Sequence, residues 1–255
     1  MRSNITGLLL AVFVLARAPA GVAETLSGYA YLTPEMQAMQ DDEFGNPGQL
    51  TVDAGRTLFA AAGARGQACS SCHGDDGGEL DRQRIARYPV YDARHARPLT
   101  LRGQVLQCWA ERLGNPPLAY ADERALQLEA FVRSRARGET VAVEIHANLQ
   151  PYYEAGEKLY RTRWGQVDIA CHQCHDYHAG QTFRGQVMTQ GQSNGFPAYR
   201  FTTGQTVGLQ ERITECLTNL RAEPYPADSD EYLSLEVYLS ARSNGLKIET
   251  PAIRY

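Results

Sequence analysis

One five-residue pattern, two cysteines separated by two residues and followed by a histidine, occurs twice in this chain of 255 residues. The copies are Cys69–His73 and Cys171–His175. Two thiols at this spacing can form thioethers to one porphyrin, and the histidine after them can ligate its iron. Zinc or disulfide bonds are the alternatives, but a histidine in both copies favours haem. We expect two covalently bound haem c groups. The covalent attachments fall on Cys69, Cys72, Cys171 and Cys174, and the axial histidines are His73 and His175.

The chain around the two motifs is an internal repeat. A short helical pattern precedes each motif, and a Pro-x-Tyr segment, a lone cysteine and an amphipathic helix follow it. The matching segments are Asp53–Phe59 and Glu154–Tyr160, Pro89–Tyr91 and Pro197–Tyr199, Cys108 and Cys216, and Leu128–Val132 and Leu235–Leu239. A helix, an attachment loop, a long loop and a closing helix form the plan of a small helical cytochrome c domain. We therefore expect an all-α fold of two tandem cytochrome c-like domains, residues 51–145 and 146–255. Residues 24–50 form an N-terminal extension outside the repeat.

Residues 1–23 have the pattern of a secretory signal peptide. Arg2 precedes an apolar run, and the small residues Ala18–Ala23 supply a cleavage site. An uncleaved anchor is the alternative, although the apolar run is short for a membrane span. We expect cleavage, export to the periplasm and no membrane attachment. The formal net charge of −4 argues against binding to nucleic acid or anionic membranes.

The second axial ligand of each iron is expected to be a cysteine. A methionine is usual at this position, but the first half contains none after His73, and Met188 of the second half has no counterpart. His95 and His178 are possible ligands, but they do not correspond in the repeat. The residues that do correspond are Cys108 and Cys216, each just before the closing helix. Cysteine thiolate is a strong ligand for ferric iron. A Cys108–Cys216 disulfide and free thiols are the alternatives.

The two halves differ at the position four residues before each lone cysteine, which is Gln104 in the first half and Arg212 in the second. Positions i and i+4 share one face of a helix. Arg212 is therefore expected to place a cation beside the Cys216 sulfur, where it favours thiolate and can hold an anionic substrate. Pairing with Glu215 or with a haem propionate, or simple exposure to solvent, are the alternatives.

With these residues in view, the chain resembles the SoxA family, the diheme cytochrome c subunits of the thiosulfate-oxidising Sox system. The resemblance covers essentially the whole mature chain. Its most specific part is the pair of lone cysteines together with the segment Arg212–Cys216, and it also includes Ser27–Tyr29, Asn46–Gly48 and both haem-attachment motifs.

The resemblance implies an L-cysteine S-thiosulfotransferase, which joins thiosulfate to a cysteine of the carrier protein SoxYZ and passes two electrons to a cytochrome c. It implies a heterodimer with a smaller monohaem cytochrome, SoxX. The catalytic cysteine, which ligates the second iron and carries a persulfide, falls on Cys216. The substrate-binding arginine falls on Arg212, and the axial cysteine of the first haem falls on Cys108.

Three other functions fit parts of the pattern. A thiosulfate dehydrogenase that forms tetrathionate also uses two c-haems and a cysteine ligand, although we expect one such cysteine rather than a pair. A non-catalytic diheme electron carrier does not need Arg212. A diheme peroxidase needs an open iron position, and paired cysteine ligands argue against it.

Overall fold

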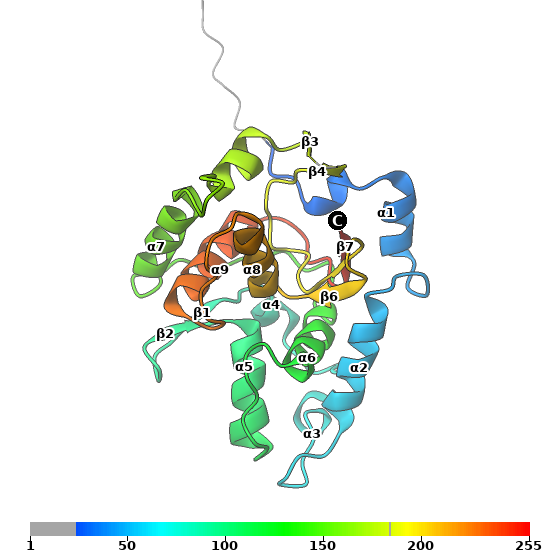
Figure 1. Ribbon diagram of the computed structural model, residues 1–255. Helices are drawn as coiled ribbons and strands as arrows, with labels where there is room; N and C mark the ends of the chain where they lie inside the picture. Colours follow the sequence, from blue (N-terminus) through cyan, green and yellow to red (C-terminus); the bar gives the residue numbers. More distant parts are fainter. Residues whose placement is uncertain (1–23, 184) are drawn as a thin grey trace, which may run out of the picture.

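The computed structural model describes residues 24–183 and 185–255 (Figure 1). The predicted signal peptide, residues 1–23, lies outside the described residues. Two pairs of packed helices form the frame. In the first half, α2 (Gln49–Ala60) packs on α6 (Glu123–Ser134), and in the second, α7 (Gln150–Arg161) packs on α9 (Asp230–Arg242).

Each helix pair crosses at a glycine. A Cβ atom at Gly55 of α2 would lie under 3.0 Å from the carbonyl oxygen of Gln127 in α6. A Cβ atom at Gly156 of α7 would meet the carbonyl oxygen of Ser234 in α9 in the same way. Glycine removes this clash and lets the two backbones touch. The same crossing therefore recurs in the two halves.

The closing helices bury the side chains that the sequence pattern selected. Leu128 and Phe131 of α6 and Leu235 and Tyr238 of α9 are all nearly inaccessible to solvent. Both helices have capped N-termini, because Ser229 Oγ accepts a hydrogen bond from the Tyr232 N–H before α9 and an aspartate side chain does the same before α6. The sequence stripes thus lie inside the two helices, and the caps mark where the helices begin.

The remaining helices carry or flank the attachment motifs and the lone cysteines. They are α3 (Ser70–His73), α4 (Arg82–Ile85), α5 (Leu101–Gln107), α8 (Leu209–Asn219), and the π-helical turns η2 (Cys108–Arg112) and η3 (Gln173–Tyr177). Single π-helical turns are frequent at functional sites. Here one begins at the lone cysteine of the first half, and the other contains the attachment histidine of the second.

The expected all-α class is correct for the frame but incomplete, because the described chain also has short strands. In the first half β1 (Val90–Asp92) pairs antiparallel with β2 (Arg97–Leu99), and in the second β5 (Ala198–Arg200) pairs antiparallel with β6 (Gln205–Val207). The others are β3 (Thr182–Phe183), β4 (Gln186–Val187) and β7 (Ala252–Arg254), which lies parallel to β5. Strands of two or three residues are too short for an alternating pattern to appear in the sequence.

The N-terminal extension packs on the second half. It contains η1 (Gly28–Tyr31) and α1 (Pro34–Asp41), which lie beside β7 (Figure 1). The buried Gln40 side chain accepts a hydrogen bond from the Ile253 N–H at 2.8 Å, and Asn46 Nδ2 donates to the Pro251 carbonyl at 2.8 Å. These bonds join segments more than 200 residues apart in the sequence, and they make the extension part of the wall around the second half.

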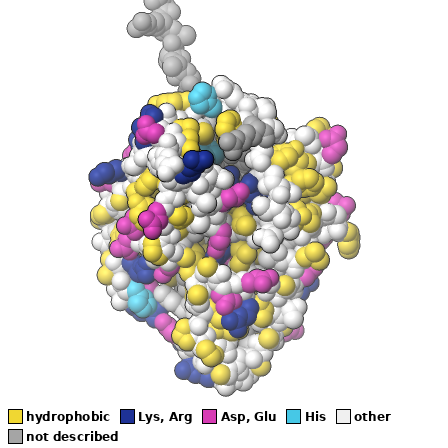
Figure 2. Space-filling view, in the orientation of Figure 1, with side chains coloured by type: hydrophobic (Ala, Val, Ile, Leu, Met, Phe, Trp, Pro, Cys, Tyr) yellow, Lys and Arg dark blue, Asp and Glu magenta, His cyan; other side chains and the backbone are white. Residues whose placement is uncertain are grey.

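Acidic and basic side chains are interspersed over the face seen in Figure 2, with hydrophobic side chains between them. Within residues 24–183 and 185–255, no helix combines the length and the apolar character that crossing a membrane requires.

Candidate functional site: two haem-binding cavities

The first cavity contains His73 and Cys108, together with the attachment cysteines Cys69 and Cys72. It encloses about 1790 Å³, part of which is open to solvent. Its apolar wall includes residues of both frame helices, Phe59, Leu128 and Val132. The structure thus places all four residues predicted for the first haem around one cavity.

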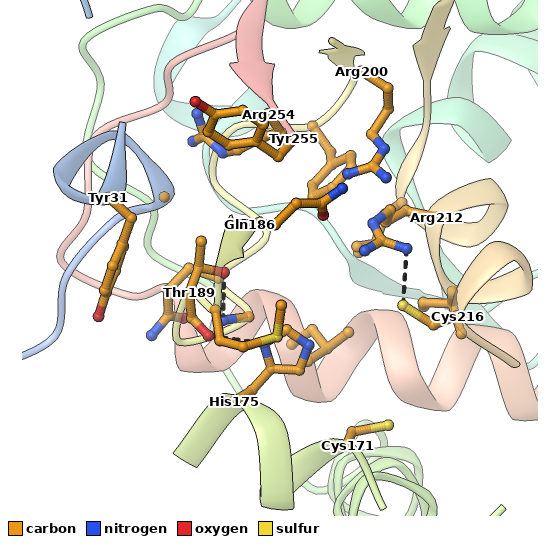
Figure 3. Close-up of a pocket in the computed structure, with 18 of the residues that line it drawn as sticks. Tyr31, Cys171, His175, Gln186, Thr189, Arg200, Arg212, Cys216, Arg254 and Tyr255 are labelled. Carbon is orange, nitrogen blue, oxygen red and sulfur yellow. Dashed lines mark hydrogen bonds between the residues drawn. The ribbon is translucent and has the colours of Figure 1, made fainter. Parts of the chain in front are cut away.

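The second cavity contains Cys171, His175, Arg212 and Cys216 (Figure 3). It encloses about 1150 Å³, also partly open, and its lining is mostly apolar. Cys174 directly precedes His175 within η3. The four residues predicted for the second haem are therefore also brought together, by a helical turn on one side of the cavity and by α8 on the other.

The backbone after the motif orients His175. Its Nδ1 lies 2.8 Å from the carbonyl oxygen of Thr189 and so carries the proton, which leaves Nε2 free to ligate a metal (Figure 3). Burial lowers the pKa of His175, which favours the neutral ring that ligation requires. Gly191 has a positive φ of 71°, and a side chain there would press on the imidazole. Thr189 could not be predicted from the sequence, because a contact through a backbone carbonyl leaves no residue signature.

The neighbours of the two lone cysteines match the expectation from the i, i+4 spacing. Arg212 Nη1 lies 2.9 Å from Cys216 Sγ, whereas Gln104 Nε2 lies 3.3 Å from Cys108 Sγ. Arg212 Nη1 also lies 3.3 Å from Glu215 Oε2. The guanidinium is therefore shared between the sulfur and a carboxylate, which combines the functional expectation with one of its alternatives.

The alternative Cys108–Cys216 disulfide is absent from the structure. All six cysteines lie in described segments and are free, and these two line different cavities. Met188 also lines the second cavity, but it still has no counterpart in the first.

The donor set of each cavity fits a covalent haem. The first cavity is lined by two attachment thiols, an imidazole and the Cys108 sulfur, and the second by Cys171, His175 and Cys216, with Cys174 next to His175 in the chain. The walls are largely apolar, which suits a porphyrin. Burial raises the pKa of the Cys69 thiol to about 11 and that of Cys171 to about 12. A thioether sulfur carries no charge and so tolerates the same burial.

Two residues of the second site are not among those expected from the sequence: Arg200, which lines the cavity, and Thr189, which holds His175. Glu215 is expected only as an alternative partner of Arg212, and it contacts both Arg200 and Arg212. The internal repeat carried a signal for Arg200, because extending the match of Pro89–Tyr91 with Pro197–Tyr199 by one residue aligns Asp92 with Arg200.

A helical fold with attachment motifs opening into apolar cavities defines a c-type cytochrome, a protein that binds haem c covalently. The family model described as "SoxA/TsdA, cytochrome c domain" matches twice, at residues 54–141 and 155–248. The chain belongs to the SoxA family of cytochromes c.

The relatives agree with this assignment. The L-cysteine S-thiosulfotransferase subunit SoxA of Pseudaminobacter salicylatoxidans is 38% identical, covering 94% of this chain and 85% of that protein. The subunit of the same name from Rhodovulum sulfidophilum is 33% identical, covering 91% and 80%. The crystal structure of SoxXA from P. pantotrophus matches with a TM-score of 0.83 and 31% identity, over 91% of this chain and 87% of that one.

Proposed function

We propose that this chain is a two-haem cytochrome built from tandem domains, residues 51–145 and 146–255, with one haem c in each cavity. His73 and Cys108 would ligate the first iron, and His175 and Cys216 the second. The recurrence of the glycine crossing and of the lone cysteine in both halves supports this division. Bound haem supplies one-electron acceptance next to each cysteine sulfur.

The ligand assignment is tested by spin resonance of the oxidised, haem-loaded protein. Two low-spin ferric signals with histidine and thiolate ligation are expected, and Cys108→Met should convert only one of them. Histidine–methionine signals in the unaltered protein would contradict the assignment.

We propose that the chain catalyses the oxidative conjugation of thiosulfate to a cysteine of a SoxYZ-like carrier. It would act in the periplasm, in a heterodimer with a SoxX-like monohaem cytochrome, and pass two electrons to a cytochrome c acceptor. The single observation that carries this proposal is the Arg212 guanidinium 2.9 Å from Cys216 Sγ in a cavity shared with His175. A cation beside a sulfur nucleophile both favours the thiolate and attracts a dianion.

The residues act in two steps. Arg212 binds the sulfonate oxygens and presents the terminal sulfur to Cys216, and a sulfur–sulfur bond forms between them with the loss of two electrons. The carrier thiolate then attacks the sulfur that bears the sulfonate, and the Cys216 thiolate leaves. In sum, a thiol and thiosulfate give the thiosulfonate conjugate, one proton and two electrons. A persulfide on Cys216 would take part by the same exchange chemistry.

Replacement of Arg212 tests the catalytic role. Arg212→Ala in the haem-loaded heterodimer should lower the rate of carrier conjugation by about 100-fold or more, because the site loses the cation that binds thiosulfate and favours the Cys216 thiolate. Mass spectrometry of the carrier measures the conjugate. The matched variant Gln104→Ala, at the equivalent position of the first half, should leave the KM for thiosulfate unchanged. An Arg212→Ala protein that conjugates the carrier at the unaltered rate would contradict the role of Arg212. A heterodimer that forms no conjugate, and whose redox behaviour Arg212→Ala leaves intact, would instead be an electron carrier.

Thiosulfate dehydrogenase is the second candidate, because the arginine–cysteine pair could equally present one thiosulfate to another. The same assay without carrier separates the two functions. Rapid tetrathionate formation that the carrier protein does not inhibit would favour a thiosulfate dehydrogenase. Turnover of thiosulfate that requires the carrier protein would favour the thiosulfotransferase.

A further inference from the structure

Arg200 is a buried cation that faces the second cavity without a full set of partners. It is the last residue of β5, and only 4% of its side chain is exposed. Its Nη2 donates to Glu215 Oε1 at 3.1 Å, while its buried Nε–H has no hydrogen-bond partner within the described chain. An unpaired, buried donor on a charged group is costly, so its presence beside a cavity points to an absent acceptor.

Glu215 connects Arg200 to the sulfur site. One carboxylate oxygen accepts from Arg200 at 3.1 Å, and the other lies 3.3 Å from Arg212 Nη1. Because Arg212 also reaches Cys216 Sγ, the carboxylate keeps both guanidinium groups on the Cys216 side of the cavity, where Figure 3 shows them pointing inward. Two cations share one carboxylate, so these three side chains carry a net formal charge of +1. The pKa of Arg200 is accordingly lowered, by burial first and by the charge of Arg212 second.

The first half has the same framework with different charges. At a constant offset of 108 residues, Asp92, Gln104 and Gln107 correspond to Arg200, Arg212 and Glu215. The contact also recurs, since Gln107 Nε2 donates to Asp92 at 3.0 Å where Arg200 donates to Glu215. At these three positions the formal charge is −1 in the first half and +1 in the second.

Arginines also line the first cavity, where Arg84, Arg94 and Arg112 are available to haem propionates. What only the second half has is an arginine four residues before the lone cysteine, joined through one carboxylate to a buried arginine. This arrangement suits an anion that reacts at Cys216. We propose that Arg200 is a second substrate-binding residue, which with Arg212 holds the sulfonate group of thiosulfate while Glu215 positions the two guanidinium groups. This inference rests on the proposed function and refines its substrate site.

The decisive variant is Arg200→Gln in the haem-loaded heterodimer. The KM for thiosulfate should rise by about 10- to 100-fold with a much smaller change in kcat, because a charge-assisted hydrogen bond to the bound anion is lost. The dissociation constant for sulfate, an unreactive dianion measured by calorimetry, should rise by a similar factor. Arg200→Lys should fall between, because it keeps the charge but loses the planar pair of donors.

Further variants check that the anion binds only in the second half and that Glu215 positions the two arginines. Asp92→Asn, at the matched position of the first half, should leave sulfate affinity unchanged. Glu215→Gln should weaken sulfate binding, and Glu215→Asp should restore part of it, as expected for a positioning residue.

The inference is overturned if Arg200→Gln leaves both sulfate affinity and the thiosulfate KM unchanged. It is also overturned if the variant alters only the potential or spectrum of the second haem, since Arg200 would then be a propionate partner. If Arg200→Gln leaves sulfate affinity and the thiosulfate KM unchanged while Arg212→Ala abolishes conjugation, only the role of Arg200 is rejected. Failure of the unaltered heterodimer to conjugate thiosulfate to the carrier would reject the proposed function itself.

Discussion

At the scale of single residues, one buried carboxylate is in an unusual state. Glu236 of α9 accepts a hydrogen bond from Gln210 Nε2 at 3.0 Å and one from the Tyr120 hydroxyl at 3.3 Å. Its pKa is raised to about 7, by burial first and by the neighbouring carboxylate of Glu129 second. Glu211 adds to this repulsion, and Arg102 and Arg133 oppose it. Three carboxylates therefore face two guanidinium groups, so a proton on Glu236 balances the cluster.

This state predicts a pH dependence of stability. A carboxyl group whose pKa rises from 4.5 to about 7 on folding stabilises the native state fully below pH 4.5. The contribution, about 3 kcal/mol at most, is lost as pH rises through 7. Denaturant unfolding of the haem-loaded protein should thus show stability falling from pH 5 to pH 8 by more than in Glu236→Gln. If the free energy of unfolding falls equally with pH in the two proteins, Glu236 does not have the raised pKa.

At the scale of the elements, two glycines fix how the frame helices meet. Gly55 and Gly156 each lie against a backbone carbonyl of the partner helix, so the packing there is set by backbone contact rather than by side chains. The cavities lie next to these helix pairs, with Phe59 of α2 lining the first and Tyr160 of α7 lining the second. A displaced helix would therefore change the shape of a proposed haem site.

Gly156→Ala should lower the free energy of unfolding by about 1–3 kcal/mol, because the added methyl group overlaps the Ser234 carbonyl. Gly103→Ala in α5 is the matched control. There the nearest atoms belong to the side chains of Leu99 and Thr100, so the helix-favouring effect of alanine should leave stability unchanged or higher. Chemical denaturation followed by circular dichroism measures both, and equal effects would show that the helix crossing is not tight.

At the scale of the whole molecule, one arginine joins the two halves. Arg102 of α5 is 1% exposed and donates through Nε to Glu129 of α6 at 2.8 Å. Its Nη1 pairs with Glu211 in the first turn of α8. Gly208, the N-cap of α8, lies against the guanidinium and leaves no room for a side chain. The helix before Cys108 is thereby tied to the helix that carries Cys216.

Arg102→Ala should therefore destabilise the protein by about 3–5 kcal/mol, because it leaves two partly buried carboxylates without their cation. The exposed Arg124–Asp122 pair supplies the control, and Arg124→Ala should cost about 1 kcal/mol or less. Unfolding of the haem-loaded protein followed in the Soret band and by circular dichroism measures both. A small effect of Arg102→Ala would mean that other contacts between the halves, such as the Tyr120–Glu236 and Arg97–Asp228 pairs, hold them together without it.

The sequence alone determined the features that depend on local spacing. Attachment cysteines three positions apart, a histidine next to them, and an arginine one helical turn before Cys216 are set by neighbours along the chain, so their arrangement could be predicted. Amphipathic periodicity likewise located α6 and α9.

Only the tertiary structure decided the contacts between distant segments. Arg200 reaches Glu215 from a separate strand, Arg102 reaches Glu211 across 109 residues, and Gln40 meets Ile253 across 213. No periodic pattern encodes such pairs, because they form only when packing brings the elements together. Cys216 and Arg212 thus come together because they lie one turn apart on α8, whereas Arg200 joins them only through the tertiary fold.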